Sequence, residues 1–361
     1  MKYRSYHLLL AGIFSLLTTG AMAEKTSDKP YWQDVQVVSV NKEYPRTSFM
    51  TYDNRTDALT GKFEKSNYYQ LLNGTWKFFF ADSYKDLPAN ITAPSVSTDS
   101  WNDIKVPGNW EVQGYGVAIY TNHGYEFKPR NPQPPTLPEA NPVGVYRRDI
   151  DIPADWKERD IYLHLAGAKS GVYVYINGQE VGYSEDSKNP AEFLINKYVK
   201  PGKNVLTLKI FRWSTGSYLE CQDFWRISGI ERDVYLYSTP KQYIADYKVS
   251  ASLDKEQYKE GIFNLEVTVE GPSATASSIA YTLKDASGKA VLQDAIHIKS
   301  RGLSNFIAFD EKKIAEVKAW NAEHPNLYTL VLELKDAQGK VTELTGCEVG
   351  FRTSEIKDGR F

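Results

Sequence analysis

The sequence predicts an all-β chain that folds as a jelly-roll sandwich followed by an immunoglobulin-like β-sandwich. From about residue 68 onward, short runs alternate apolar and polar side chains with a period of two, which is typical of half-buried strands. Turn signals such as Asn177-Gly178 separate these runs. The 25 Tyr, 15 Phe and 8 Trp suit pleated surfaces, and few segments have a helical period. Strands at this spacing, with turns between them, indicate sandwiches.

The first sandwich is expected over residues 67–240. The run "LLNGTWKFFF" places Trp76, Phe78 and Phe80 on one face of a strand, and "GVYVYI" alternates aliphatic residues with Tyr173 and Tyr175. The runs "GKNVLTLKIFRW" and "RDVYLYS" supply two further strands. The proline-rich segment 128–144 cannot lie in a central strand. It is expected to be an extended surface loop that serves either as a rigid connection or as part of an interface.

The second sandwich is expected over residues 241–352. Its strands are "YKVSASLD", "GIFNLEVTVEG" and two hairpins, whose turns "KDASGK" (284–289) and "KDAQGK" (335–340) have the same chemistry. Two short segments, "AEFLINKYV" (191–199) and "EKKIAEVKAW" (311–320), are the best helix candidates.

The first 23 residues differ from the rest of the chain. Lys2 and Arg4 precede an apolar run, and Ala21-Met22-Ala23 has the small-x-small form of a cleavage site, so residues 1–23 are predicted to be a secretory signal peptide. No later segment is apolar enough to span a membrane. We expect an exported protein, in the periplasm or, as the alternative, outside the cell. Residues 24–66 then form an N-terminal extension.

Charge and cysteine usage exclude several classes of function. The chain has 43 basic and 45 acidic residues and no basic stripe, which argues against a nucleic-acid or anionic-membrane partner. Only Cys221 and Cys347 are present, in different predicted domains, so no disulfide framework is expected. The histidines are scarce and not at ligand spacing, which argues against a transition-metal site.

The loop within "FRWSTGSYLECQDFWRISGIERDVYLY" (211–237) carries the most chemistry. Indole rings pack on the C–H faces of sugars and an aspartate fixes hydroxyls, so this loop suits a carbohydrate contact. Alternatively, Trp213 and Trp225 fill the core and Asp223 pairs with Arg226 or with Arg232. The sequence has no phosphate-binding loop, nucleophile elbow or zinc helix. A carboxylate pair for glycoside hydrolysis cannot be chosen from spacing alone.

Several blocks carry a resemblance to a known family. "RWSTGSYLECQDFWRISGIERDV", "VPGNWEVQGYGVAIYTN", "NPVGVYRR" and "LNGTWKF" resemble N-terminal blocks of family 2 glycoside hydrolases, in particular the large bacterial β-galactosidases. "HPNLYTLVLEL" and "CEVGFR" resemble the end of that family's immunoglobulin-like domain. The likeness runs from about Tyr68 to Phe361. Cys221 stands where an acidic residue is usual, beside the position that contacts ligand, and we expect little effect from it.

The resemblance implies that this chain is the N-terminal, non-catalytic part of an exported β-galactosidase with a retaining mechanism. The family's (β/α)8 catalytic barrel, with its two catalytic glutamates and magnesium, would be absent from this chain, and residues 353–361 would begin it. A hairpin turn is expected at Asp358-Gly359. The chain alone is expected to be inactive, with the missing barrel and a galactoside as its partners. The sequence leaves a homo-oligomer open.

Two site residues follow from the resemblance. Asn122 matches the asparagine that holds a galactose hydroxyl, and Asp223 matches the aspartate that contacts substrate and helps to bind sodium or potassium. A carboxylate oxygen is a suitable ligand for such cations. Asn122 could instead be a turn residue in "TNHG". Two other functions stay open: a stand-alone secreted carbohydrate-binding β-sandwich protein, and a family 2 enzyme that acts on another β-glycoside such as a glucuronide.

Overall fold

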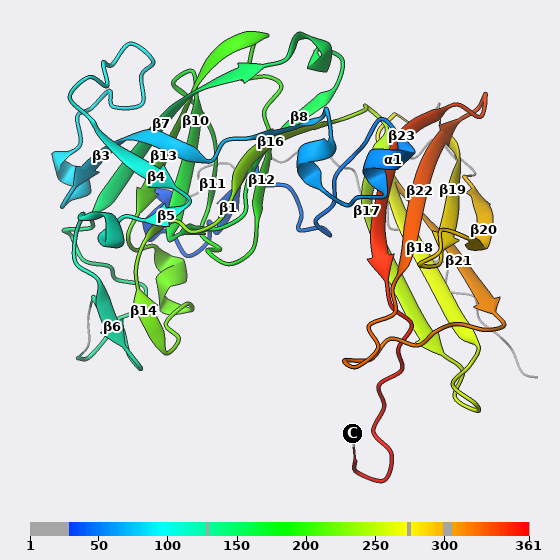
Figure 1. Cartoon of the computed structure of the whole chain (residues 1–361). Helices are drawn as coiled ribbons and strands as arrows, with labels where there is room; N and C mark the ends of the chain where they lie inside the picture. The colour runs from blue at the N-terminus through cyan, green and yellow to red at the C-terminus, as the bar shows by residue number, and fades with distance from the viewer. Residues whose placement is uncertain (1–28, 128–129, 273–275, 299–304, 361) are drawn as a thin grey trace, which may run out of the picture.

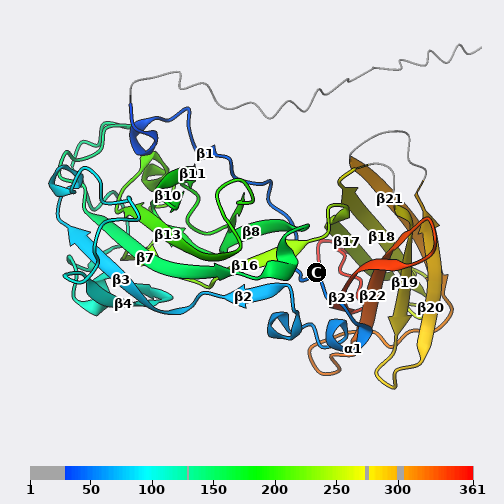
Figure 2. The same ribbon diagram turned by 90° about the horizontal axis from the view of Figure 1, so that it is seen from above.

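The computed structural model describes residues 29–127, 130–272, 276–298 and 305–360. The predicted signal peptide, residues 1–23, lies outside these ranges. The chain forms two β-lobes side by side (Figures 1 and 2), and the prediction of an all-β chain with two successive sandwiches is confirmed. The described residues contain no (β/α)8 barrel.

The first lobe is built on two sheets whose strands all pair antiparallel. The larger sheet has the order β1-β11-β10-β13-β7-β3-β4, and the smaller has the order β12-β8-β16-β2. The bounds of their strands are β1 Ser39–Val40, β2 Tyr69–Leu71, β3 Gly74–Ala81, β4 Asn102–Val106, β7 Val143–Ile152, β8 Asp160–Leu165, β10 Gly171–Ile176, β11 Gln179–Ser184, β12 Ala191–Leu194, β13 Gly202–Phe211 and β16 Val234–Thr239. Side chains from both sheets, including Trp76, Leu163 and Leu236, form one buried core.

Strand β10 has the period-two alternation of side chains that its sequence predicts. Val172 and Val174 face the core between the sheets, whereas Tyr173 and Tyr175 lie on the opposite face, as the alternation predicts. The tyrosine face is also buried, because the N-terminal extension covers it with Trp32.

The Asn177-Gly178 turn joins β10 to β11, as predicted. Both residues have positive φ, 51° and 80°, which is the geometry of the two-residue hairpin that Asn-Gly favours.

Smaller elements complete the first lobe. A three-stranded sheet has the order β5-β15-β9, with β5 Gly108–Asn109, β15 Gly229–Ile230 and β9 Ala168–Lys169. The helical elements of the described residues are short: η1 Tyr31–Gln33, α1 Arg55–Ala58, η2 Phe63–Lys65, η3 Tyr84–Asp86, η4 Glu111–Gln113, η5 Ala154–Trp156 and η6 Thr215–Tyr218. Of these, α1 belongs to the N-terminal extension and lies against the second lobe. A two-stranded ribbon of β6 and β14 projects from the lobe in Figure 1 and is described below.

The second lobe packs a three-stranded sheet on a four-stranded one. The first has the order β17-β18-β21, with bounds Tyr243–Leu253, Gly261–Glu270 and Asn305–Ile314. The second has the order β20-β19-β22-β23, with bounds Ala290–His297, Ala276–Lys284, Tyr328–Asp336 and Val341–Val349. The two predicted turns have matching geometry, with Gly288 at φ 83° and Gly339 at φ 79°. The predicted turn at Asp358-Gly359 is also present, closed by hydrogen bonds between Lys357 and Arg360.

Both predicted helices are wrong. Residues 191–194 form β12, which pairs with β8 and buries Phe193 completely in the core. Residues 311–314 belong to β21, which pairs with β18. The Glu, Lys and Ala residues of these segments favour a helix in isolation. Backbone pairing with a neighbouring strand outweighs that weak preference.

The N-terminal extension crosses both lobes and is drawn in blue in Figures 1 and 2. We call residues 41–58 the strap. Arg46 pairs with Glu192 of the first lobe. Further along, Thr51 Oγ1 donates to Glu343 Oε1 at 2.5 Å in the second lobe, and Tyr52 N donates to Leu344 O at 2.8 Å. The strap therefore ties one lobe to the other.

Within the ranges that the structure describes, we find no helix with the length and apolar character needed to cross a membrane.

Candidate functional site

The candidate site is a ribbon of two short antiparallel strands, β6 (Ile119–Thr121) and β14 (Phe224–Arg226). Tyr120 pairs with Trp225, and Thr121 pairs with Phe224. The next residue along each strand is Asn122 on one side and Asp223 on the other. The fold therefore brings the two residues predicted from the sequence to the same end of the ribbon, directly beyond the last paired residues.

The two faces of the ribbon differ in exposure. Tyr120 and Trp225 are paired across the strands and share one face. The hydrogen bond from Tyr120 Oη brings the Asp223 carboxylate to that face, and Asn122 lies directly beyond the end of β6. All four are exposed. The alternate residues share the other face and are partly or fully buried; they are Ile119, Thr121, Phe224 and Arg226. The ribbon thus presents one amide, one carboxylate and two aromatic rings to solvent.

The carboxylate at the tip is held in a defined orientation. Tyr120 Oη donates a hydrogen bond to Asp223 Oδ1 at 2.7 Å, across the two strands. This bond, together with the charge on Asp223, raises the pKa of Tyr120. Beside it, Asn122 Oδ1 lies 2.7 Å from Nδ1 of His123, and Thr121 Oγ1 donates to the carbonyl of His123 at 2.6 Å. Asn122 therefore stands at the start of a short turn, as its alternative interpretation also expected.

A buried arginine supports the ribbon from below. Arg226 is only 1% exposed, and its guanidinium donates to the carbonyls of Glu220 at 3.3 Å and Thr121 at 3.4 Å. Its Nε also lies 3.8 Å from Oε2 of the buried Glu126. Arg226 thus binds backbone on both sides of the tip and supports it from below.

A second buried pair lies next to the first. Arg212 Nη2 donates to the carbonyls of Val117 at 2.9 Å and Arg226 at 3.3 Å, and its Nη1 lies 3.5 Å from Glu111 Oε1. Glu111 Oε2 accepts a hydrogen bond from Ser228 N at 2.8 Å. Burial raises the pKa of Glu111, and the hydrogen bond from Ser228 and the charge on Arg212 oppose that effect. The base of the ribbon is therefore fixed by charge-assisted hydrogen bonds.

The segment that leads into β14 is anchored by two more acids. Glu185 accepts from Thr215 Oγ1 and from Gly216 N, each at 2.7 Å, and burial raises its pKa to about 7. Glu220 accepts from Ser187 N at 2.8 Å and from its Oγ at 2.6 Å. The loop before Asp223 is thus hydrogen-bonded to the main sandwich rather than free to move.

The two tryptophans of the loop have different environments. Trp213 is partly buried among aromatic side chains, and its Nε1 donates to Glu126 Oε1 at 3.0 Å, so it braces the loop. Trp225 is 54% exposed, so the interpretation of it as a core residue is wrong. It lies on the outward face of a two-stranded ribbon that no second layer of the described residues covers.

Asp223 does not pair with either arginine proposed for it. Arg226 points beneath the ribbon, and Arg232 donates to the carbonyls of Ala166 and Lys188. The partner of Asp223 is Tyr120, which the sequence reasoning missed. Two-residue alternation in "IYTN" and "DFW" was the signal that could have identified Tyr120 and Trp225 as neighbours of the two predicted residues.

The proline-rich segment packs on its own lobe. Tyr218 Oη donates to the carbonyl of Thr136 at 2.6 Å, and Asn141 exchanges hydrogen bonds with the backbone of Trp213 at 2.7 and 3.1 Å. Leu137 is buried in the same aromatic cluster as Trp32. The segment therefore covers the loop that carries Trp213.

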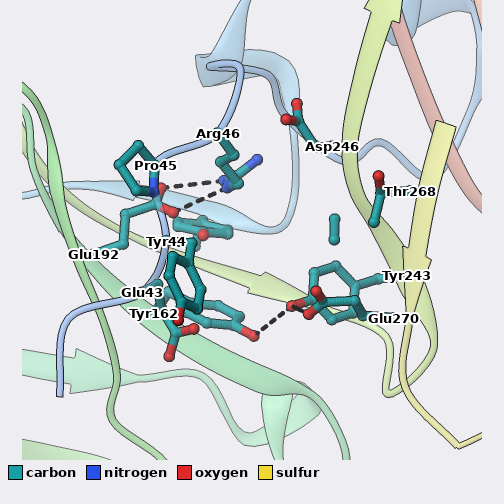
Figure 3. A pocket seen from close by; sticks show the side chains of 12 residues that line it. Glu43, Tyr44, Pro45, Arg46, Tyr162, Glu192, Tyr243, Asp246, Thr268 and Glu270 are labelled. Carbon is teal, nitrogen blue, oxygen red and sulfur yellow. Dashed lines mark hydrogen bonds and ion pairs between the residues drawn. The ribbon is translucent and has the colours of Figure 1, made fainter. Parts of the chain in front are cut away.

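A separate cavity of about 300 Å³ lies where the strap meets both lobes (Figure 3). Its polar groups are engaged with one another: Arg46 with Glu192 at 2.9 Å, Tyr162 with Tyr243 at 3.2 Å, and Tyr243 in turn with Glu270 at 3.2 Å. These contacts join the strap and the first strand of the second lobe to the first lobe. The cavity is a feature of that junction and does not include the ribbon.

No metal cluster is found in the part of the chain that the structure describes, where no three His, Cys, Asp or Glu side chains gather as ligands. Cys221 and Cys347 are both free thiols and partly buried. At the ribbon, the one carboxylate is that of Asp223, so these residues can supply part of a cation site and not a complete one.

The two successive β-sandwiches each match a domain of one family of glycoside hydrolases. Residues 69–240 match the family description "Glycosyl hydrolases family 2, sugar binding domain", and residues 242–352 match "Glycosyl hydrolases family 2". The chain belongs to glycosyl hydrolase family 2.

Similar proteins agree with this assignment. The chain is 39% identical over 342 residues to a protein of Priestia megaterium named "Beta-galactosidase", and 35% identical over 335 residues to one of Photobacterium profundum with the same name. Each match covers 91% of this chain and 32% of the relative, so the chain spans about a third of the length of these relatives.

Solved structures show the same fold at lower identity. A Bifidobacterium dentium β-glucuronidase is similar with a TM-score of 0.63 and 20% identity, over 81% of this chain and 50% of that chain. A β-glycosidase from Bacteroides vulgatus is similar with a TM-score of 0.61 and 21% identity, over 80% of this chain and 34% of that chain. At this identity, the likeness concerns the fold alone.

Proposed function

We propose that this chain is the non-catalytic, substrate-contacting part of a β-galactosidase. The observation that carries the proposal is that Asn122 and Asp223 lie together at the exposed end of the β6–β14 ribbon, directly beyond the Thr121–Phe224 pair. Segments from distant parts of the sequence meet there, on a base of buried charges that fixes their position. The names of the relatives support galactosides as the substrate class.

Each residue has a chemical role in this proposal. The amide of Asn122 can both donate to and accept from a sugar hydroxyl, and the carboxylate of Asp223 accepts from hydroxyls. Asp223 would also supply one hard oxygen ligand to sodium or potassium, with the other ligands outside the described residues. Magnesium and the two catalytic glutamates belong, in this proposal, to the barrel of the complete enzyme, which would be the partner of this chain.

A glucuronide is the less suitable substrate. A glucuronate ring carries a carboxylate, which proteins bind with arginine or lysine. The exposed face of the ribbon offers Asp223 and no basic side chain, while Arg226 and Arg212 are buried and already bonded. Like charges at this face would repel a glucuronide.

A stand-alone carbohydrate-binding protein is the second candidate, and the description of the first domain as a sugar binding domain favours it. Both candidates use the same ribbon. The gene sequence beyond residue 361 separates them, because the enzyme requires two barrel glutamates there.

A saccharide titration tests the proposed site. The chain, labelled with ¹⁵N, is titrated with methyl β-D-galactoside and followed by NMR. We expect shift changes confined to residues 119–123 and 222–226, and weaker binding by Asp223→Asn than by the matched control Asp99→Asn, which changes an exposed aspartate elsewhere. Binding that is equally strong in both variants would rule out Asp223 as a contact.

We also propose that residues 1–23 direct export, with the periplasm as the destination. N-terminal sequencing of the protein recovered from the periplasmic fraction should begin near Glu24, and an intact Met1 in that fraction would argue against cleavage.

A further inference from the structure

Two aromatic rings stand exposed beside the proposed polar contacts. Tyr120 is 56% exposed and Trp225 is 54% exposed. They are paired in register across β6 and β14, with ring centroids 5.7 Å apart and ring planes at 62°. The two exposed rings therefore meet at an angle, and we call this arrangement the aromatic corner. The pairing of β6 with β14 fixes its position.

The corner and the polar pair together have the dimensions of a small site. Residues opposite each other on antiparallel strands have Cβ atoms about 5 Å apart. Residues two apart on one strand are separated by about 7 Å. Tyr120 and Trp225 are such an opposite pair, and Asn122 and Asp223 follow directly beyond the ends of the two strands, so one hexose ring can reach all four side chains.

We propose that Tyr120 and Trp225 form an aromatic platform that binds the apolar face of a single galactopyranoside ring, while Asn122 and Asp223 bind its hydroxyls. The inference rests on the proposed function and extends it by assigning two further binding residues. It also assigns a sugar preference to them.

The chemistry of the sugar determines that preference. The axial O4 of galactose leaves the opposite face of the ring, at C3, C4 and C5, with C–H groups only. The electron-rich face of an indole or phenol ring attracts such polarised C–H groups and excludes water from them. In a glucoside O4 is equatorial, so this apolar patch is smaller and the platform contact is weaker.

The platform is coupled to the polar contact through one side chain. The hydroxyl of Tyr120 donates to Asp223 Oδ1 at 2.7 Å, while its ring lies against Trp225. The orientation of the carboxylate and that of the aromatic corner are therefore set together. A ring seated on Trp225 would have its hydroxyl edge beside Asp223 and Asn122.

The experiment is a titration of the ¹⁵N-labelled chain with methyl β-D-galactoside, followed in every variant through the backbone amides of residues 119–123 and 222–226, and in the parent also through the indole N–H resonance of Trp225. That resonance is identified by its absence from Trp225→Phe. We expect Trp225→Ala to raise the dissociation constant about three- to tenfold, as the loss of one aromatic contact implies. Trp225→Phe should retain most of the affinity. The control is Leu219→Ala, which truncates an apolar side chain that is 84% exposed in the adjoining loop, and we expect it to change nothing.

The outcomes distinguish this inference from the proposed function. Unchanged affinity in Trp225→Ala, with weaker binding by Asp223→Asn, would overturn the platform and leave the proposed function standing; Trp225 would then be a surface for another protein segment. Absence of any binding by the unmodified chain would overturn both. Equal affinity for methyl β-D-glucoside would overturn the assignment of galactose preference to the platform.

Discussion

Arg46 in the strap donates two hydrogen bonds to Glu192 in β12, from Nε to Oε2 at 2.9 Å and from Nη2 to Oε1 at 3.2 Å. His164 Nδ1 lies 2.8 Å from the same carboxylate. Burial by itself would raise the pKa of Glu192, but the hydrogen bonds from His164 and Arg46 and the charge on Arg46 lower it to about 2. Since the unfolded pKa is about 4.3, this contact stabilises the fold above that pH, and the contribution is lost as the pH falls towards 2.

Arg46→Ala should therefore destabilise the protein strongly. It leaves the buried carboxylate of Glu192 without its main counter-charge, and the removal of one partner from a buried ion pair costs about 3–5 kcal/mol. Urea unfolding at pH 7 measures the loss. Arg55→Ala is the matched control. Arg55 is also an arginine of the strap and pairs with a glutamate, Glu333, but its side chain is 52% exposed.

In Arg55→Ala, Lys335 remains 3.5 Å from Glu333, so we expect a loss of about 1 kcal/mol or less. Equal losses in the two variants would show that the junction does not depend on the buried pair.

Asp223→Asn should leave stability unchanged within about 0.5 kcal/mol, because the side chain is exposed and the amide can still accept from Tyr120. Thermal unfolding of the variant and the parent measures this. A large fall in melting temperature would mean that Asp223 holds the ribbon together, and that any loss of sugar binding reflects unfolding.

The buried carboxyl group of Glu343 should make the free energy of unfolding decrease as the pH rises. Burial raises its pKa to about 7, against the opposing hydrogen bonds from Thr51 and Ile244 N. The folded protein then binds a proton that the unfolded chain releases above about pH 4.3, so the free energy of unfolding decreases between about pH 4.3 and 7. Urea unfolding at pH 5, 6 and 7 should give a shallower slope for Glu343→Gln than for the parent.

The absolute stability of that variant is not diagnostic, because a glutamine can turn its oxygen towards Ile244 N and donate from its NH₂ to Thr51 Oγ1. Only the slope of the free energy of unfolding against pH tests the prediction. Glu185→Gln, which removes the other buried acid with a pKa of about 7, should flatten it in the same way.

The purified chain should not hydrolyse an aryl β-galactoside. Retaining glycoside hydrolysis requires two carboxyl groups about 5.5 Å apart across the scissile bond, and the ribbon presents one. A colorimetric assay against a buffer blank tests this. Turnover that survives repurification and disappears in Asp223→Asn would contradict it.

Local patterns predicted much of the fold correctly. Period-two alternation in β3 and β10 and the Asn177-Gly178 turn determined strands and a hairpin, because these signals depend on neighbours in sequence. The failures at 191–199 and 311–320 have the opposite cause. These segments pair with β8 and β18, which are distant in sequence. Helical propensity depends only on neighbouring residues, so it could not predict this pairing.

The sequence named two residues of the candidate site and did not predict how the site is arranged. Asn122 and Asp223 followed from the family resemblance. Their positions at one end of the ribbon, and the exposed Tyr120 and Trp225 beside them, follow from the pairing of β6 with β14. That pairing joins segments that are separated in the sequence by several other strands. The exposure of Trp225 was misjudged because a tryptophan between strands is usually buried.

The ribbon has only three residues in each strand, too few for a hairpin to be stable by itself. Protein engineers who wish to transplant its four outward side chains to a different scaffold would therefore have to move Arg212 and Arg226 with them, together with the glutamates that neutralise these cations. A transplant limited to the exposed side chains would lack the buried residues that hold the ribbon in its conformation.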